Sequence, residues 1–386
     1  MRIAYVTETY PPEVNGVALT VERTVRHLRE RGHALQLIRP RQRGEAARDD
    51  AEEWRSAGLP IPMYPDLRMG LAFAATLRRR FAATRPDVVH VATQGPLGRA
   101  AVAGARALGL PVTSDFRTNF HCYSRYYGFG RFEPLVRGYL RAFHNRTDCT
   151  FVPARALARS LAAEGFERLE VLGRGVDAER FTPAARSEAL RRAWGVRNAD
   201  EPVALYVGRL AAEKNVALAL RAFSALQRVR PDAHMVVVGD GPQRRRLEAE
   251  FPRARFLGLQ RGEALAAHYA SADLFLFPSL SETFGNVTLE ALASGLVVVA
   301  YDAAAAGEHI RDGENGVLAR GDGPAGFIDA ACRAAALMPH WPRLRAAARR
   351  EAQAADWDVL LRRFDARLAH FAFRDQPERA PDVALA

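Results

Sequence analysis

The segment 274–300 constrains the fold most, because it joins two continuous apolar runs through a polar loop and a stretch with helical spacing. The first run stops at Pro278, the helical spacing ends at Gly295, and the second run covers residues 296–300. Continuous apolar strands that alternate with helices are typical of parallel sheets whose two faces are both covered. We therefore expect strand, loop, helix and strand in an α/β fold.

Two carboxylates stand eight residues apart in this segment, Glu282 in the loop and Glu290 in the helix. Open parallel sheets bind ligands at the carboxyl ends of their strands, and the amides that open a helix attract phosphate. Ionised carboxylates accept hydrogen bonds from hydroxyl groups. The combination predicts a ligand with both phosphate and hydroxyl groups, such as a nucleotide sugar. For Glu290 alone, an acidic residue that favours the helix dipole is the alternative.

The same strand, glycine and helix order occurs at two other places. Gly16 follows the expected strand 3–7 and opens a helix, while Gly208 follows the expected strand 203–207. A glycine at such a position lets a phosphate approach the backbone closely. Arg209 and Lys214 flank the second helix start, so that two cations and a positive helix end predict a diphosphate site.

Lys214 is the one lysine of the sequence, and the other 54 of its 55 basic residues are arginine. Arginine and lysine are not interchangeable, because lysine offers a compact ammonium charge in place of a planar fork. The solitary lysine thus indicates a position that needs a compact charge, with chance as the alternative.

Composition limits the class of protein. A length of 386 residues favours two domains, each large enough for its own core. Three cysteines without metal spacing, and the absence of a signal peptide or a long apolar run, favour the cytoplasm. The net charge of +11 permits peripheral contact with an anionic membrane at its inner face. Neither a nucleic-acid module nor a stripe of aromatic and basic residues is present, so nucleic acid is not an expected partner.

Breaks in the periodicity divide the chain. Two glycines in 173–177 and a charged stretch behind them predict a boundary, so we expect domains at 1–174 and 175–355. Residues 356–386 contain an amphipathic helix that is expected to cover an exposed face, followed by a frayed tail. The charged and irregular stretch 39–57 predicts a flexible surface loop.

Four motifs together resemble those of the family 4 glycosyltransferases and cover nearly the whole chain. They are PPEVNGV at 11–17, GRLAAEKN at 208–215, GDGP at 239–242, and the pair Glu282-x7-Glu290 within SETFGNVTLEALASG. The resemblance implies the α/β fold called GT-B, with two Rossmann-like, doubly wound domains that face a cleft. It also implies that the second domain holds most of the donor, the first holds the acceptor, and a last helix crosses back to the first domain.

The resemblance also assigns residues by position. Arg209 and Lys214 would bind the diphosphate, Glu290 the ribose, and Glu282 the hexose hydroxyl groups. The amides around Phe284 would hold sugar and phosphate, and Gly16 would meet the diphosphate from the first domain. The full expected donor-binding set is Gly16, Arg209, Lys214, Gly258, Glu282, Phe284, Gly285, Asn286, Val287 and Glu290. Such enzymes transfer with retention of configuration and require no metal or other cofactor, and the chain has no DxD-type motif at a suitable loop.

One departure from the family pattern concerns the reacting centre. Many relatives have a histidine in the loop after the strand 111–114, whereas the matching position here is Arg117, in FRTNFH. Either Arg117 acts there as a fixed positive charge, or His121 takes the role, or the acceptor is handled differently. Together with Glu282, these two residues form the expected catalytic set.

The resulting hypothesis is a retaining hexosyltransferase with a nucleoside diphosphate sugar donor and a lipid or glycan acceptor. A resemblance of LPIPMYPDLRMG at 59–70 to bacterial α-mannosyltransferases that act on lipids favours GDP-mannose. The alternatives are a UDP-hexose-dependent glucosyl- or galactosyltransferase, a non-hydrolysing UDP-sugar epimerase, and a nucleotide-sugar-binding regulator. An epimerase needs a set of acid and base carboxylates around the hexose, of which only Glu282 is evident.

Overall fold

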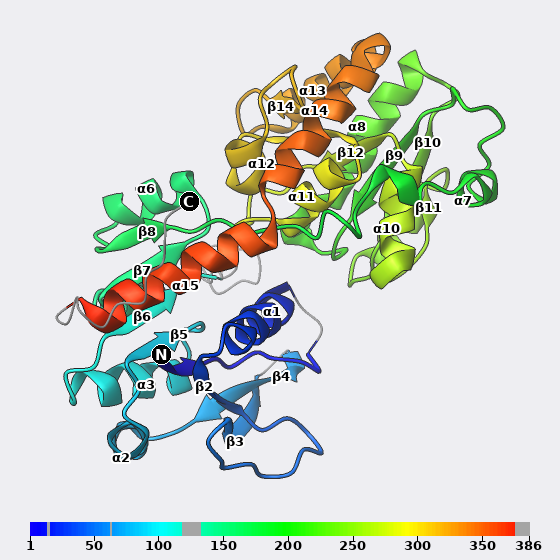
Figure 1. Ribbon diagram of the computed structural model, residues 1–386. Helices are drawn as coiled ribbons and strands as arrows, with labels where there is room; N and C mark the ends of the chain where they lie inside the picture. The colour runs from blue at the N-terminus through cyan, green and yellow to red at the C-terminus, as the bar shows by residue number, and fades with distance from the viewer. Residues whose placement is uncertain (14–15, 62–63, 118–132, 375–386) are drawn as a thin grey trace. The chain divides into compact units, whose positions relative to one another are not determined.

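The computed structural model describes residues 1–13, 16–61, 64–117 and 133–374 (Figure 1). These residues form two compact units, each described here by itself. In the described part, the first unit runs to Gly173 and resumes at Val359, and the second runs from Arg174 to Asp358. The boundary predicted after residue 174 lies beside this division. No helix in the described ranges has the length and the apolar run that crossing a bilayer requires.

The first unit is built on an eight-stranded sheet in the order β4-β3-β2-β1-β5-β6-β7-β8. All neighbours are parallel except β3 and β4, which form an antiparallel pair at one edge. The strands are β1 (Arg2–Val6), β2 (Ala34–Pro40), β3 (Glu53–Ile61), β4 (Tyr64–Leu71), β5 (Val88–Val91), β6 (Val112–Asp115), β7 (Cys149–Val152) and β8 (Leu169–Val171).

Helices cover both faces of this sheet. They are α1 (Gly16–Glu30), α2 (Ala74–Thr84), α3 (Pro96–Arg106), α5 (Glu133–His144), α6 (Arg155–Ala163) and α15 (Trp357–Phe373). One core layer joins Val21 and Leu28 of α1 to Ile3 of β1, and the opposite layer joins Leu77 of α2 and Leu97 of α3 to Val89 of β5. Burial on both faces explains why these strands are continuous apolar runs.

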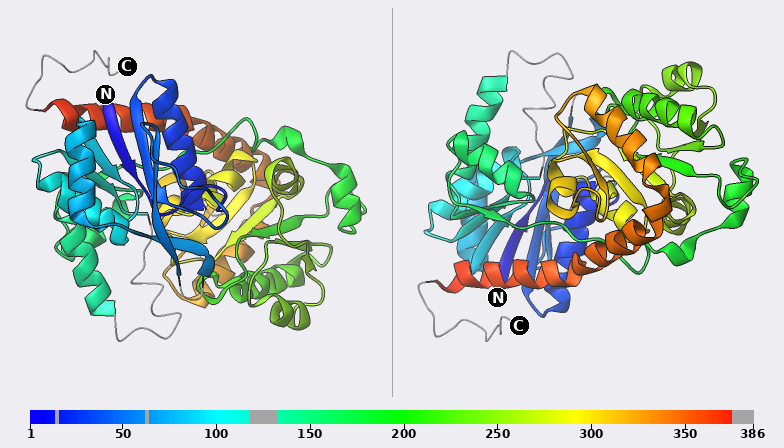
Figure 2. Two further views of the ribbon diagram at one scale, coloured as in Figure 1. Left: turned by 90° about the horizontal axis from the view of Figure 1, so that it is seen from below. Right: turned by 90° about the horizontal axis from the view of Figure 1, so that it is seen from above.

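The C-terminal helix α15 packs on the first unit, although 185 residues of chain (172–356) separate it from β8, the last strand of the sheet. Both views in Figure 2 place it beside the strands of that unit. Phe364, Leu368 and Phe371 join the same core layer as Ile3. His33 Nε2 lies 2.7 Å from Asp365 Oδ1, which adds a polar contact at the edge of this layer. The amphipathic spacing of residues 357–373 predicted that this helix would cover an exposed face.

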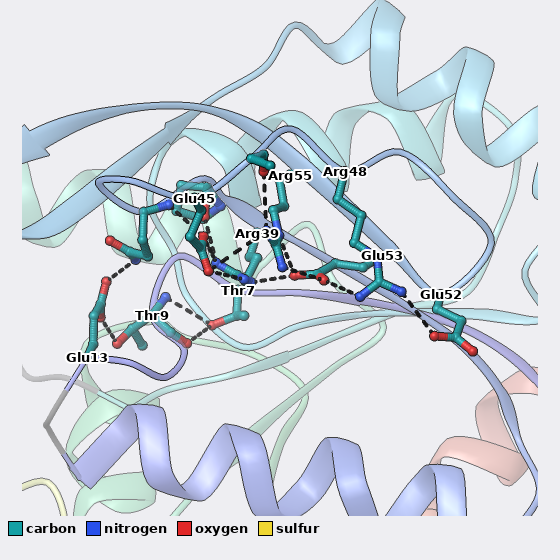
Figure 3. A network of polar contacts seen from close by, with 12 residues as sticks. Thr7, Thr9, Glu13, Arg39, Glu45, Arg48, Glu52, Glu53 and Arg55 are labelled. Carbon is teal, nitrogen blue, oxygen red and sulfur yellow. Dashed lines mark hydrogen bonds and ion pairs between the residues drawn. The ribbon is translucent and has the colours of Figure 1, made fainter.

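The prediction of a flexible loop at 39–57 was wrong at both ends, because β2 extends to Pro40 and Glu53–Ile61 forms β3. A network of arginines and carboxylates organises this region (Figure 3). Arg39 is buried, and it donates to Glu53 at 2.7 Å and to both oxygens of Glu45 at 2.7 and 2.8 Å. The charges that made the stretch look solvated therefore pair with one another, and charge-assisted bonds of this kind fix a segment strongly.

The second unit has a six-stranded, wholly parallel sheet in the order β11-β10-β9-β12-β13-β14. Its strands are β9 (Val203–Val207), β10 (His234–Val238), β11 (Arg255–Phe256), β12 (Leu274–Phe277), β13 (Val297–Tyr301) and β14 (Val317–Ala319). Its α-helices are α7 (Glu188–Ala193), α8 (Val216–Val229), α9 (Arg244–Glu250), α10 (Gly262–Ser271), α11 (Asn286–Ala293), α12 (Ala304–His309), α13 (Pro324–Ala336) and α14 (Trp341–Ala354). Short 3₁₀ turns lie at η2 (Pro183–Ala185), η3 (Ala212–Lys214) and η4 (Met338–His340).

The strand order of the second sheet contains one reversal of direction. From β9 the chain moves outward to β10 and β11, and it then returns to the other side of β9 with β12. Ligands of open α/β sheets bind outside the carboxyl ends of the strands at such a switch point. The loops after β9 and β12 therefore flank the position where a ligand is expected.

Candidate functional site

The loops after β9 and β10 are joined backbone to backbone. The amide of Gly208 donates to Val238 O at 3.0 Å, and the amide of Gly239 donates to Gly258 O at 2.8 Å. A Cβ atom on Gly239 would lie 2.0 Å from Gly208 O, so this approach requires glycine. Gly258, predicted to bind the donor, thus helps to hold the loop wall together through its carbonyl group.

Lys214 and Glu282 form an ion pair across the switch point. Lys214 lies at the end of η3 after β9, and its ammonium group donates to Glu282 Oε1 in the loop after β12. Ser279 Oγ donates to the same carboxylate oxygen at 3.0 Å. The fold therefore brings together two residues that the sequence assigned to one ligand from separate motifs.

Arg209 is more exposed than Lys214 and lies in the same loop. Its Nη1 is 3.9 Å from Glu213 Oε1, and 43% of its side chain is exposed. Glu213 is buried, and its carbonyl oxygen accepts a hydrogen bond from Ser281 Oγ at 2.9 Å. This hydrogen bond is a second contact between the loops after β9 and β12. The two contacts hold in place the loop that carries Arg209 and Lys214.

Glu290 lies within α11 and has a partner that the sequence did not indicate. Tyr269 of α10 is buried and donates its phenolic hydrogen to Glu290 Oε2 at 2.9 Å. Burial raises the pKa of Glu290 to about 7, and the Tyr269 hydrogen bond opposes that rise only in part. A ligand hydroxyl group that donates to this carboxylate would stabilise its ionised form. From the sequence, Tyr269 is indistinguishable from an ordinary core residue of a helix.

The start of α11 combines a structural aromatic residue with backbone donors. Phe284 is buried in the core of the second unit, and its carbonyl oxygen accepts from the amide of Ala305 at 2.7 Å. Gly285 caps the helix with a φ of 85°, a conformation that favours glycine. The first amide groups of a helix lack intrahelical acceptors, so those at Asn286 and Val287 suit an anion. The side chain of Phe284 thus serves the core, and a donor contact there would involve the backbone.

Two predicted residues belong to the first unit, and one lies outside the described residues. Gly16 is exposed at the first position of α1, where its carbonyl oxygen accepts from Thr20 Oγ1 at 2.7 Å. Arg117 follows β6. His121 falls in residues 118–132, which the structure does not describe, so its predicted role stays a prediction.

Arg117 points its guanidinium group at a buried carboxylate. Asp115 Oδ2 accepts from Arg117 Nε at 2.7 Å and lies 3.1 Å from His90 Nε2. Burial by itself would raise the pKa of Asp115, but the charge of Arg117, assisted by His90, holds that pKa well below its usual range. An arginine in this position keeps its proton, which favours the fixed-charge alternative over proton transfer.

Glu8 is a further residue that the sequence did not single out. It follows β1 at the switch point of the first sheet, between β1 and β5. Its Oε1 accepts from the amide of Leu97 at the start of α3, at 2.8 Å, and its own amide donates to Thr93 Oγ1 at the same distance. Burial raises the pKa of Glu8 to about 7. In the sequence, its position directly after an expected strand was the one feature that could have marked Glu8 as a candidate site residue.

Within the ranges that the structure describes, no three His, Cys, Asp or Glu side chains gather as a metal-binding group. The expectation that no metal is required stays a prediction.

Known proteins resemble this chain in sequence and in fold. Residues 14–180 match the family described as Glycosyltransferase Family 4, and residues 201–336 match Glycosyl transferases group 1. A GDP-mannose-dependent alpha-mannosyltransferase of Mycolicibacterium smegmatis is 36% identical over 365 residues, which cover 93% of this chain and 95% of the relative. One of the same name from Mycobacterium tuberculosis is 35% identical over 378 residues, or 96% of each chain.

Among solved structures, the sucrose-phosphate synthase of Thermosynechococcus elongatus superposes with a TM-score of 0.76. The match covers 97% of this chain and 100% of that one at 18% identity. This likeness and the two Rossmann-like units confirm the predicted GT-B fold class.

Proposed function

The chain belongs to glycosyltransferase family 4, and on that premise we propose that it transfers mannose from GDP-mannose to a lipid or glycan acceptor. The transfer retains the configuration of the sugar and needs no metal. The observation that carries this proposal is the similarity to two GDP-mannose-dependent enzymes over more than nine-tenths of the chain. That the chain is a glycosyltransferase follows from the family; the donor sugar and the acceptor class are the proposal.

The geometry of the second unit supports a nucleotide sugar at the switch point. Lys214 and Arg209 offer positive charge where the diphosphate would lie, and the start of α11 offers amides. Departure of a nucleoside diphosphate builds negative charge on its leaving oxygen, and fixed cations and amides stabilise that charge without rearranging. Glu290 is placed to accept hydrogen bonds from the ribose, while Glu282 is placed to accept from the hexose.

One measurement tests the identity of the donor. A thermal-shift titration with GDP, UDP, GDP-mannose and UDP-glucose identifies the nucleotide, because a ligand at about a hundred times its Kd adds about 2.7 kcal/mol to the free energy of unfolding. We expect stabilisation by GDP and GDP-mannose only. If UDP and UDP-glucose stabilise the protein and the guanosine nucleotides do not, the donor is a UDP-hexose and the proposal of GDP-mannose is wrong. Absence of any shift at saturating nucleotide would remove the basis of the proposal.

Turnover separates the enzyme classes. Transfer of radiolabelled mannose to an extracted lipid fraction requires the acceptor, whereas an epimerase changes the nucleotide sugar without one and a regulator does neither. We expect GDP release to depend on added acceptor, and the anomeric coupling of the product to show retention.

We also propose that the first unit visits an anionic membrane surface from the cytoplasmic side. Leu59, Leu71 and Phe73 are exposed near the start of α2, and Phe73 is 83% exposed. Arg78 and Arg79 of α2 are exposed as well. Apolar side chains beside arginines favour an anionic bilayer. Sedimentation with phosphatidylglycerol vesicles, but not with phosphatidylcholine vesicles, is the expected result, and Phe73→Asp should abolish it.

A further inference from the structure

A hollow of about 750 Å³ opens in the second unit beside η2, η4 and α14. Its lining includes Pro202, directly before β9, and Asp273, directly before β12. It therefore lies at the amino ends of the strands, the edge opposite to the loops that carry Lys214 and Glu282. A ligand at this edge would not occupy the candidate donor site.

One carboxylate in the wall of the hollow is shared by three arginines. Asp273 accepts from Arg186 at 3.1 Å, from Arg191 at 2.9 Å and from Arg345 at 3.3 Å. Asp273 and Arg191 are buried. Glu188 adds a second carboxylate, 3.4 Å from Arg186 and 3.9 Å from Arg191, but 61% of its side chain is exposed. Two negative charges do not neutralise three cations, and a charge imbalance away from bulk water is costly. Burial lowers the pKa of the Arg345 guanidinium group, the charge of Asp273 opposes that change, and repulsion from Arg186 and Arg191 adds to the effect of burial.

Arg349 adds a further cation to the same wall. It donates to the carbonyl oxygens of Phe181, Ala293 and Ala178 at 2.6 to 2.7 Å. Within the described residues, no carboxylate lies within ion-pair distance of its guanidinium group. In the same part of the chain, Nη2 of Arg186 and Nη2 of Arg345 make no hydrogen bond. The wall thus has an excess of positive charge, and it also has guanidinium N–H groups that are available to donate hydrogen bonds to a ligand.

Apart from Asp200 and Arg230, the rest of the lining is apolar and includes flat side chains. Pro183, Met338 and Trp341 belong to it, together with further prolines. Arg230 lines it too, but Asp232 neutralises it at 2.6 Å. A bare inorganic ion would leave this apolar surface in contact with water, whereas a ligand with a hydrocarbon part would cover it.

We propose that the hollow binds a small organic phosphate, with the phosphate between Arg186, Arg345 and Arg349 and the apolar part against the proline-lined wall. A phosphate dianion matches the excess charge, and its oxygens accept paired hydrogen bonds from guanidinium groups. The site shares an element with the donor site, since Arg345 and Arg349 donate to Gly295 O and Ala293 O at the end of α11, whose start carries Asn286 and Val287.

The test is a calorimetric titration of the full chain with phenyl phosphate, with inorganic phosphate and phenol as reference ligands. Phenyl phosphate should bind at least threefold more tightly than inorganic phosphate, and phenol should not bind. Ala346→Glu places a carboxylate on an exposed helical position in the lining and removes no native hydrogen bond, so it should weaken binding at least tenfold without loss of folding. Arg345→Gln should weaken binding as well.

Two control variants separate this site from the donor site. Arg246→Gln changes an exposed arginine of α9 outside the hollow and should bind as the wild type does. Lys214→Ala should also keep its affinity for phenyl phosphate, whether or not the proposed donor is correct. The proposal is overturned if the wild type does not bind phenyl phosphate, if inorganic phosphate binds equally well, or if Lys214→Ala abolishes binding while Ala346→Glu leaves it intact.

Discussion

Lys214 donates a hydrogen bond from its ammonium group to Glu282, and the two residues are 68 positions apart in the chain. Both side chains are about 15% exposed, so the pair is largely shielded from solvent but can still contact a ligand. The contact fixes the position of the one lysine beside the carboxylate proposed to accept from the hexose. A donor that enters here would meet a cation and a carboxylate already arranged side by side.

Lys214→Ala should weaken GDP binding by about ten- to a hundredfold. Hydrogen bonds to charged groups contribute about 1.5–3 kcal/mol, and a diphosphate would lose such a bond here. Calorimetry with GDP measures the effect. Lys214→Arg keeps the charge but replaces a compact group by a fork, so it should recover only part of the affinity. Equal GDP affinity in wild type and Lys214→Ala would place the diphosphate elsewhere.

Donor affinity should increase as the pH rises through about 7. Since the pKa of Glu290 is about 7, its ionised fraction grows about tenfold between about pH 6 and pH 8, and the ionised form accepts hydroxyl hydrogens better. GDP affinity measured across this range should follow that fraction. Glu290→Gln should bind GDP weakly and with a flat pH profile. A sloping profile in that variant would assign the titration to another group.

Glu290 should lower the free energy of unfolding of the ligand-free protein as the pH rises, whereas it should increase donor affinity over the same range. A carboxyl group whose pKa is raised by folding contributes stability that is complete below its unfolded pKa and is lost as the pH rises through the folded value. Glu290→Gln should therefore unfold at a higher temperature than the wild type at about pH 8. The difference should shrink at about pH 5. Calorimetric melting of the ligand-free proteins checks this sign.

Tyr269→Phe should shift the pH profile of donor binding to higher pH. Its hydroxyl group lowers the pKa of Glu290, so its removal lets burial raise that pKa further. A purely structural role of Tyr269 would change the melting temperature and leave the midpoint of the pH profile in place. Titration of GDP affinity in parallel with the wild type distinguishes the two outcomes.

Gly239→Ala should be far more destabilising than Gly321→Ala. Both glycines have positive φ, at 134° and 69°, which costs an alanine about 1–2 kcal/mol. At Gly321 nothing lies within 4 Å of the new Cβ, whereas at Gly239 it would meet Gly208 O at 2.0 Å. Separation of the two loops should add about 1–3 kcal/mol. Urea unfolding measures the difference, and similar losses in both variants would contradict the close packing of these loops.

Arg117→Gln should lower the free energy of unfolding by about 3–5 kcal/mol, because it leaves the buried carboxylate of Asp115 without its main cation. The difference in free energy of unfolding between the wild type and the variant should be largest near neutral pH. It should become smaller in acid, where Asp115 of the variant takes up a proton. Denaturant unfolding at several pH values tests this. A variant that keeps its stability but loses turnover would favour a direct catalytic role.

Much of the fold was determined by the sequence alone. Continuous apolar runs, helical spacing and glycines at strand ends predicted parallel α/β units, because burial on both faces of a sheet leaves this pattern in the chain. The amphipathic spacing of residues 357–373 predicted a covering helix for the same reason. The resemblance of four motifs to glycosyltransferase family 4 supplied the candidate donor-site residues by position, and their role in donor binding stays a prediction.

Only the tertiary structure decided which polar groups pair. Tyr269 belongs to a helix whose spacing does not distinguish a buried phenol from an ordinary core ring, yet its hydroxyl group reaches Glu290. Arg39 lies in a stretch whose charges indicated a solvated loop, but they neutralise one another within the fold. Lys214 was recognisable as unusual, while its contact with Glu282 was not. Local sequence records burial and turns, whereas pairing depends on which distant segments the sheet order places side by side.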